Sequence, residues 1–290
     1  MANILVTGAN GQLGTALKRI GFTMLDDVFY TDLAELDITD QEAVRRFVQL
    51  HEIDTIINCA AYTAVDKAED EPEKAALINT EAVANLATVA YDEDCLLIHV
   101  STDYVFDGTA TEPYTEKSRV NPQSVYGRTK LAGEKAIAAS HCLSVIIRTA
   151  WLYSEDGNNF VKTMLRLAKE KGELRVVSDQ IGSPTYAGDL AKAIVAIVSD
   201  DNVMEKPGVY HYSNEGICSW YEFAREIMSA GGMECRVEPL TTEQYPTKAK
   251  RPAYSVLDKT KIKKSFSLEI PELQEALTRC MYNLIPENRR

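Results

Sequence analysis

Residues 3–14 read NILVTGANGQLG and join a short apolar strand to a glycine-rich turn. Gly8, Gly11 and Gly14 follow the strand and precede residues of helical period, the context in which a glycine fingerprint binds a dinucleotide. Such glycines permit a tight turn, a close approach of backbone N–H groups to a pyrophosphate, and tight helix packing. The spacing is G-x-x-G-x-x-G rather than G-x-G-x-x-G, and the alternative is that these glycines serve the turn alone. We expect this stretch to open a dinucleotide-binding fold.

Strand-like runs recur through the N-terminal half. They are separated by stretches with apolar residues at three- and four-residue spacing, which is typical of βαβ units. The further runs are 28–31, 55–58, 96–101 and 143–149. Five such strands with right-handed crossovers predict an α/β fold, a Rossmann-type doubly wound parallel sheet. Functional residues are expected just after the strands, because these sheets bind ligands beyond their carboxyl ends.

A looser rhythm begins near Trp151. We expect a dinucleotide-binding domain over 1–150 and a smaller C-terminal substrate-binding region over 151–290, with residues 173–200 in part returning to the first domain. The elements expected there are helices near 159–171, 189–198, 219–229 and 271–284 and strands near 175–177 and 209–212. Because no flexible linker stands out, we expect the two regions to share one cleft.

Composition and charge exclude several classes of protein. The 290 residues are 45% hydrophobic and 26% charged, as in ordinary globular domains. With 43 acidic and 31 basic residues the net charge is −12, so no nucleic-acid partner is expected. No apolar run approaches the roughly 20 residues that span a bilayer, and the start MANILVTGAN lacks a basic leader, so neither a membrane nor export is expected. Six scattered cysteines without a C-x-x-C pair favour a reducing cytoplasm.

Further strand ends carry candidate cofactor contacts. Asp32 closes the second strand, where a carboxylate can accept hydrogen bonds from an adenosine ribose and repel a 2′-phosphate. Asp37 and Ile38 could flank the adenine, but Asp37 or Thr39 could instead cap the next helix. After the third strand, Ala61 and its small neighbour allow a close backbone pass beside a nicotinamide.

A tyrosine and a lysine four residues apart provide the candidate chemistry. Tyr126 and Lys130 would point from one face of a helix. A nearby ammonium is expected to lower the pKa of the phenol, giving an acid that donates to a carbonyl oxygen. The spacing also occurs by chance on exposed helices. Thr102 favours the functional interpretation, because it follows the fourth strand and offers a hydroxyl to the same oxygen.

Through TGANGQLG, STDYVF and YGRTK the chain resembles the extended short-chain dehydrogenase/reductase family. Within that family it is most similar to reductases of dTDP-sugars. Their further shared segments are NCAAYTAVDKAE, STDYVFDG, YGRTKLAGEK, RTAWLY, GNNFVKTMLRLAKE, DQIGSPT and RPAYS. The resemblance implies reduction of the C4 ketone of dTDP-4-dehydro-β-L-rhamnose to dTDP-L-rhamnose by NADPH or NADH, for surface polysaccharide.

The resemblance also implies a role for each matching residue. Tyr126 would be the proton donor, Lys130 its electrostatic partner and a ribose ligand, and Thr102 the hydroxyl that polarises the ketone. The implied cofactor contacts, beyond the glycines, are Gln12, Leu13, Asp32, Asp37, Ile38, Ala61, Tyr62, Thr63 and Val100, together with Tyr126 and Lys130. The implied sugar-nucleotide contacts are Thr102, Asp103 and Trp151. Trp151 could instead be a core residue, and Arg251 could pair with the diphosphate or simply be exposed.

The chain departs from the family in one respect. Some members are thought to form dimers through a metal held by glutamates, one of them early in the first helix, where this chain has Thr15 and Ala16. We therefore expect no metal site and leave a homodimer open.

Two other functions compete with the reductase. The first is a dehydratase or epimerase of the same fold, but related dehydratases carry an Asp-Glu pair after the threonine, whereas here Asp103 precedes Tyr104. A non-catalytic nucleotide-binding protein, resembling the regulatory subunit of methionine adenosyltransferase, would not need Thr102, Tyr126 and Lys130 together.

Overall fold

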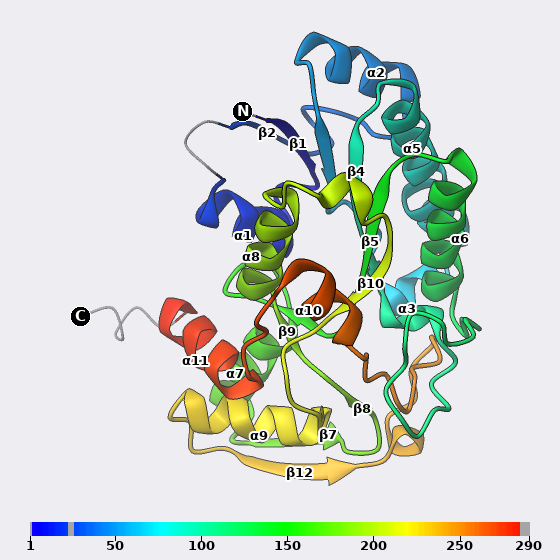
Figure 1. Cartoon of the computed structure of the whole chain (residues 1–290). Helices are drawn as coiled ribbons and strands as arrows, with labels where there is room; N and C mark the ends of the chain where they lie inside the picture. The colour runs from blue at the N-terminus through cyan, green and yellow to red at the C-terminus, as the bar shows by residue number, and fades with distance from the viewer. Residues whose placement is uncertain (1, 23–25, 285–290) are drawn as a thin grey trace.

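The structure, a computed structural model, describes residues 2–22 and 26–284. A parallel sheet of six strands lies at its centre, in the order β10-β5-β4-β3-β1-β2 (Figure 1). The strands are β1 (Asn3–Thr7), β2 (Asp27–Thr31), β3 (Thr55–Asn58), β4 (Leu96–Thr102), β5 (Ser144–Thr149) and β10 (Gly208–Tyr212). The predicted doubly wound α/β fold is confirmed. The chain reverses its direction of strand addition between β1 and β3, where such sheets bind their ligands.

Helices cover both faces of this sheet because its buried strands are apolar on both sides. Ile4 and Val6 of β1 pack toward α1 and α8, whereas Leu5 between them packs toward α2 and α5. The helices of the first layer are α1 (Gln12–Ile20), α8 (Ala187–Val198) and α10 (Thr260–Phe266). Those of the second are α2 (Gln41–Leu50), α5 (Ala82–Asp92) and α6 (Val125–Ser140), and the short helices α3 (Val65–Ala68) and α4 (Pro72–Ala76) precede α5.

A smaller unit with its own core lies beyond the carboxyl ends of the strands, in the lower part of Figure 1. Phe223 and Ile227 are fully buried at its centre. Its helices are α7 (Phe160–Lys171), α9 (Trp220–Ala230) and α11 (Leu273–Leu284). Its strand pairs are β7 (Glu173–Val177) with β12 (Arg236–Leu240), β8 (Ile181–Gly182) with β11 (Cys218–Ser219), and β6 (Leu152–Tyr153) with β9 (Thr185–Tyr186).

The chain after Trp151 is shared between the two units. Residues 208–212, expected beyond the sheet, are its sixth strand and pair with β5. Of the 173–200 segment, α8 packs on α1, whereas β7 pairs with β12 in the smaller unit. The domain division at residue 150 stays a prediction. Within residues 2–22 and 26–284, every helix is too short or too polar to span a bilayer.

Candidate active site

The glycine-rich loop that holds Gly8, Gly11 and Gly14, called the glycine cradle below, is closely packed where strand order reverses between β1 and β3. Gly8 has φ +66°, and a Cβ there would lie 2.6 Å from the backbone of Ala60 after β3. A Cβ on Gly14 would lie 2.5 Å from the Cα of Ala9, whereas one on Gly11 would meet only the carbonyl oxygen of Gly8, at 3.3 Å. The first and third glycines are therefore required by the fold, and the middle one leaves open space.

At the start of the helix after this loop, no side chain of the described structure caps the backbone N–H groups that could bind an anion. Gly11 is the N-cap of α1, has no side-chain cap in the described structure, and is followed by a first turn without acidic residues. Free backbone N–H groups at a helix N-terminus are the usual phosphate ligands in dinucleotide folds. The predicted contact Leu13 is buried in the core, so only its backbone faces this site. Gln12 accepts hydrogen bonds from Ser154 and Asn159, which joins the cradle to the smaller unit.

Asp32 lies at the carboxyl end of β2 and braces the cradle. Its Oδ2 accepts a hydrogen bond of 3.1 Å from the backbone of Asn10. Ile38 is buried nearby and Asp37 is exposed. Hydrogen bonds from Thr39 lower the pKa of Asp37. The alternative that Asp37 or Thr39 caps the next helix is wrong, because the Asp40 side chain caps α2 by accepting from Ala43 N.

The segment after β3 is fixed by a residue that sequence reasoning missed. Asn79 lies in a π-helical turn, Leu77–Glu81, and is fully buried. Its amide accepts from the backbone N of Tyr62 at 2.9 Å and donates to the carbonyl of Tyr62 at 3.1 Å. Ala61 is partly buried and Thr63 exposed on either side of this clamp. The π-helical turn itself marks Asn79 as a candidate functional residue, because such turns are frequent at functional sites, but this signal is visible only in the structure.

Thr102 and Tyr126 come together because α6 begins against the turn that follows β4. Ser124 caps α6 by accepting a hydrogen bond from Gly127 N at 3.1 Å. A Cβ on Gly127 would lie 2.3 Å from the carbonyl oxygen of Tyr104, so only glycine allows this approach. The Tyr104 and Tyr126 rings meet edge to face, with centroids 5.4 Å apart. Thr102 is 4% exposed and donates to Asp103 Oδ1 at 3.0 Å.

Lys130 lies one helical turn beyond Tyr126 but is bonded elsewhere. Its Nζ donates to the carbonyl oxygen of Val100, a predicted cofactor contact, at 2.7 Å and lies 3.3 Å from His99 Nε2. Burial lowers the pKa of Lys130 to about 8. Burial also raises the pKa of Tyr126 and outweighs the opposing hydrogen bond with Thr102. The prediction that the ammonium lowers the pKa of the phenol is therefore wrong in this geometry, and Tyr126 is a protonated donor near neutral pH.

Asp103 completes the polar group. It is 2% exposed, and burial raises its pKa to about 6. Its charge is among the causes that raise the pKa of Tyr126. The buried Thr102 and Asp103 and the partly buried Tyr126 thus share one corner at the carboxyl end of β4.

Trp151 packs against an apolar cluster of the core and forms one half of an aromatic pair. It is only partly buried, has φ +50° directly after β5, and stacks on Trp220 with ring centroids 3.5 Å apart. A Cβ on Gly182 would lie 2.7 Å from the indole, so this glycine leaves the ring its place. Strained backbone of this kind persists where the surroundings hold it, often at functional sites. Trp220, at the start of α9, was missed because its partner is distant in sequence.

A cavity of about 850 Å³ lies in the smaller unit. It is lined by α7, β7, Trp220 and the segment that ends at Arg251. Arg251 pairs with Asp66 at 2.6 Å and donates to the Tyr104 hydroxyl at 3.1 Å. Arg251 therefore links the cavity to Tyr104, whose ring contacts that of Tyr126.

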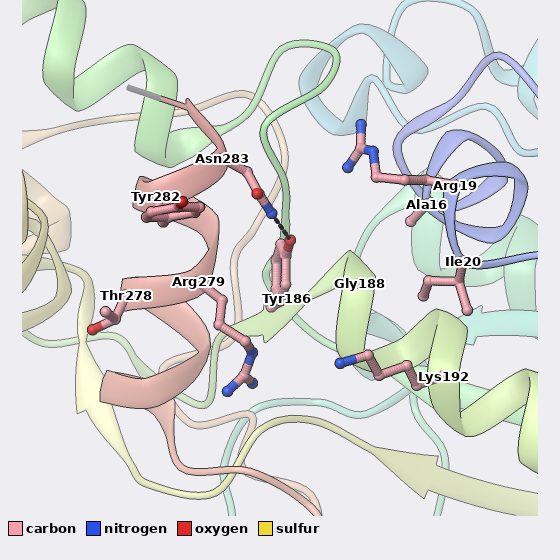
Figure 2. Close-up of a pocket in the computed structure, with 10 residues that line it drawn as sticks. All are labelled: Ala16, Arg19, Ile20, Tyr186, Gly188, Lys192, Thr278, Arg279, Tyr282 and Asn283. Atoms are coloured by element: carbon pink, nitrogen blue, oxygen red, sulfur yellow. Dashed lines mark hydrogen bonds between the residues drawn. The ribbon is translucent and has the colours of Figure 1, made fainter. Parts of the chain in front are cut away.

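A second cavity, of about 430 Å³, lies between α1, α8 and α11 (Figure 2). Arg19 pairs with Glu155 and Asp156, and Arg279 pairs with Asp189, so both guanidinium groups are neutralised within the chain. Of the described residues that line this cavity, none is a predicted site residue. Among described residues no group of three or more His, Cys, Asp or Glu side chains could hold a metal ion. The expected lack of a metal stays a prediction.

Comparison with known proteins gives matches over nearly the whole chain. The model of a family described as RmlD substrate binding domain matches residues 1–285. A spore coat polysaccharide biosynthesis protein, SpsK, of Bacillus subtilis is 46% identical over 89% of each chain. A dTDP-4-dehydrorhamnose reductase of Aggregatibacter actinomycetemcomitans is 43% identical over 96% of this chain and 97% of its own. The crystal structure of that enzyme from Bacillus anthracis, in complex with NADP, is 40% identical, has a TM-score of 0.91 and covers 97% of this chain and 99% of its own.

Proposed function

The chain belongs to the RmlD substrate binding domain family, and from this membership and the site geometry we propose that it reduces dTDP-4-dehydro-β-L-rhamnose at C4 to dTDP-L-rhamnose. The observation that carries the proposal is the corner of Thr102, Asp103 and Tyr126 at the carboxyl end of β4, in a chain that also carries the glycine cradle after β1. A purely nucleotide-binding protein needs the cradle but not the corner. A dehydratase would need a second acid after Asp103, where this chain has Tyr104, whose hydroxyl is bound by Arg251.

The residues of this corner divide the work of reduction. NADPH or NADH, when bound by the cradle of Gly8, Gly11 and Gly14, would supply the hydride. As the ketone is reduced, negative charge develops on its oxygen, and groups aimed at that oxygen stabilise the transition state. Tyr126 donates its proton there, and the Thr102 hydroxyl offers a second hydrogen bond by rotating away from Asp103 Oδ1, to which it donates in the described structure. Lys130, one helical turn from Tyr126, would hold the ribose of the cofactor and, as an ammonium, would add positive charge on the side of the phenol.

The sugar nucleotide lies between this corner and the cavity of the smaller unit. A cavity of about 850 Å³ is within the range of small-molecule sites. Trp220 lines this cavity and stacks on Trp151, so the two rings would offer an apolar surface to the sugar, and Asp103 would accept from sugar hydroxyls. Arg251 suits the diphosphate, because its planar fork matches phosphate oxygens, and its present partner Asp66 would then be exchanged.

The product of this reaction would serve surface polysaccharide. Six free cysteines fit a reducing cytoplasm, where we place the protein. A homodimer and the lack of nucleic-acid partners stay predictions.

A direct assay tests the proposed activity. Purified protein is mixed with NADPH or NADH and dTDP-4-dehydrorhamnose, and the loss of reduced-cofactor absorbance is followed while the sugar product is identified. We expect turnover to dTDP-L-rhamnose. A protein that binds NADPH tightly but leaves the ketone unchanged would be a regulatory subunit, and release of water from a dTDP-hexose would identify a dehydratase.

Asp32 is expected to set the choice of cofactor. Asp32→Ala removes a ribose acceptor and a charge that repels a 2′-phosphate. The binding of NADH should therefore weaken by roughly 1.5 to 3 kcal/mol, or at least about tenfold in Kd, and the binding of NADPH should weaken less. Asp32→Asn is the matched control, because its amide oxygen can still accept from Asn10 N. Titration of both variants with both cofactors measures the effect. Equal losses for NADH and NADPH would show that the carboxylate does not face the ribose.

Trp151 is expected to act on the sugar nucleotide alone. Trp151→Ala removes the stacked ring and should raise KM for the sugar nucleotide about tenfold, since an aromatic contact contributes roughly 0.5 to 1.5 kcal/mol beyond its area. Cofactor Kd should stay unchanged, and Trp151→Phe should keep most of the affinity. Steady-state kinetics with varied sugar nucleotide give the comparison. An unfolded Trp151→Ala protein would place Trp151 in the core instead.

A further inference from the structure

A row of four buried polar side chains runs from β1 to α6 behind the catalytic corner. Thr7, Asn58, His99 and Lys130 are each at most 1% exposed and lie on β1, β3, β4 and α6. Thr7 Oγ1 donates to Asn58 Oδ1 at 2.8 Å, Asn58 Nδ2 lies 3.0 Å from His99 Nδ1, and His99 Nε2 lies 3.3 Å from Lys130 Nζ. This row joins the glycine cradle to the lysine.

The orientation of the Asn58 amide is fixed by a backbone donor. The N–H of Ala60 donates to Asn58 Oδ1 at 3.0 Å, and a backbone N–H can only donate. The atom facing it must therefore be the amide oxygen. Asn58 Nδ2 then points to His99 and donates to Nδ1. A neutral imidazole that accepts at Nδ1 carries its proton at Nε2.

This tautomer directs an N–H group at Lys130. Lys130 Nζ already donates to the carbonyl oxygen of Val100 at 2.7 Å. An ammonium has three donors and no acceptor, so it cannot accept a hydrogen bond from the Nε2–H group. A neutral amine has a lone pair and can accept it. The row therefore favours the amine form of the lysine.

We infer that Asn58 and His99 are positioning residues that control the proton affinity of Lys130, by locking the His99 proton on Nε2. The inference rests on the proposed function, because Lys130 is there the electrostatic partner of Tyr126. Asn58 and His99 do not touch the reacting atoms. They act through the lysine, whose positive charge they oppose.

The other groups around the lysine agree with this account. Glu134, one turn further along α6, favours the ammonium but is itself paired with Arg148 at 2.6 Å. Cys59, after β3, is the second group that favours it, and burial raises the pKa of its thiol to about 12. Burial, the largest cause, lowers the pKa of His99 far below its usual value, so the imidazole is neutral.

Nuclear magnetic resonance of ¹⁵N-histidine-labelled protein tests the tautomer without any assay of activity. His99→Gln assigns the signal. We expect the parent to show a neutral His99 with its proton on Nε2. Asn58→Asp places a carboxylate opposite Nδ1 and should move the His99 proton to Nδ1. The near-isosteric Thr7→Val keeps the hydrogen bond from Ala60 N to Asn58 Oδ1 and should leave the His99 proton on Nε2. A parent with its proton on Nδ1, an imidazolium, or an unmoved proton in Asn58→Asp would overturn the inference.

The pH profile of kcat/KM tests the consequence for the lysine. Activity that needs the ammonium is lost as pH rises through the pKa of Lys130. In Asn58→Asp, His99 presents a lone pair to Nζ, so this loss should move to higher pH by about one unit or more. Thr7→Val should keep the parental profile. An unmoved profile in Asn58→Asp, or the same shift in both variants, would contradict the inference. An inactive parent that shows the expected tautomer would refute the reductase function and leave the positioning of Lys130 standing.

Discussion

Tyr126→Phe is expected to lower kcat by at least about 10²-fold, because it keeps the ring and removes the proton donor. The raised pKa of Tyr126 means that the phenol carries its proton at neutral pH. Its ring contact with Tyr104 should persist in the variant, so folding and cofactor binding should be little changed. Steady-state kinetics, cofactor titration and thermal unfolding of the same preparation measure the three effects.

Two neighbouring variants separate the roles within the corner. Lys130→Met should reduce both kcat and cofactor affinity, because the lysine is proposed to serve phenol and ribose together. Thr102→Val should give a smaller loss of kcat, since it removes one of two hydrogen bonds to the developing charge. Parental turnover by Tyr126→Phe would refute its assignment as the proton donor.

Glu134→Leu is expected to lower the free energy of unfolding by roughly 3 to 5 kcal/mol, because it strands the charge of Arg148. Glu134 Oε1 accepts from Ser101 Oγ at 2.5 Å and from Arg148 Nε at 2.9 Å, and both charged side chains are 5% exposed. The pair joins α6 to β4 and β5 behind the catalytic residues. Denaturant unfolding measures the loss, with an unchanged m-value as the sign that only stability has changed.

Matched variants show whether burial causes this effect. Arg166→Leu breaks an exposed pair with Glu170 and should cost less than about 1 kcal/mol. The double variant of Glu134→Leu with Arg148→Met should regain most of the stability, because replacing both charges leaves none unpaired. A Glu134→Leu protein as stable as its parent would contradict this account of the pair.

Local sequence predicted the features that are themselves local. The first strand and its three glycines fold as expected, since β-branched residues favour a strand and Gly8 can adopt the positive φ that the following turn requires. The N-cap of α7 at Asn159 likewise lies where the helical period begins. Tyr126 and Lys130 share α6 as their four-residue spacing required. These outcomes depend on contacts within a few residues of the chain.

The missed features depend on contacts between distant segments. The length and composition of residues 208–212 predict a strand but do not indicate which strand it pairs with. Its place beside β5 at the edge of the sheet is set by tertiary packing. Trp220 becomes part of the site only by stacking on Trp151. The pKa of Tyr126 was predicted with the wrong sign because the sequence shows the neighbouring charge but not the burial that outweighs it.

Transfer of an isotope from cofactor to sugar tests the central claim most directly. NADPH carrying deuterium at both C4 positions is incubated with the protein and dTDP-4-dehydrorhamnose, and the sugar product is examined by mass spectrometry and proton resonance. The account predicts one deuterium per product, located at C4 of a dTDP-L-rhamnose, and at least about 10²-fold slower formation of it by Tyr126→Phe. A product without deuterium, or with deuterium at another carbon, would contradict the reduction of the C4 ketone at this site.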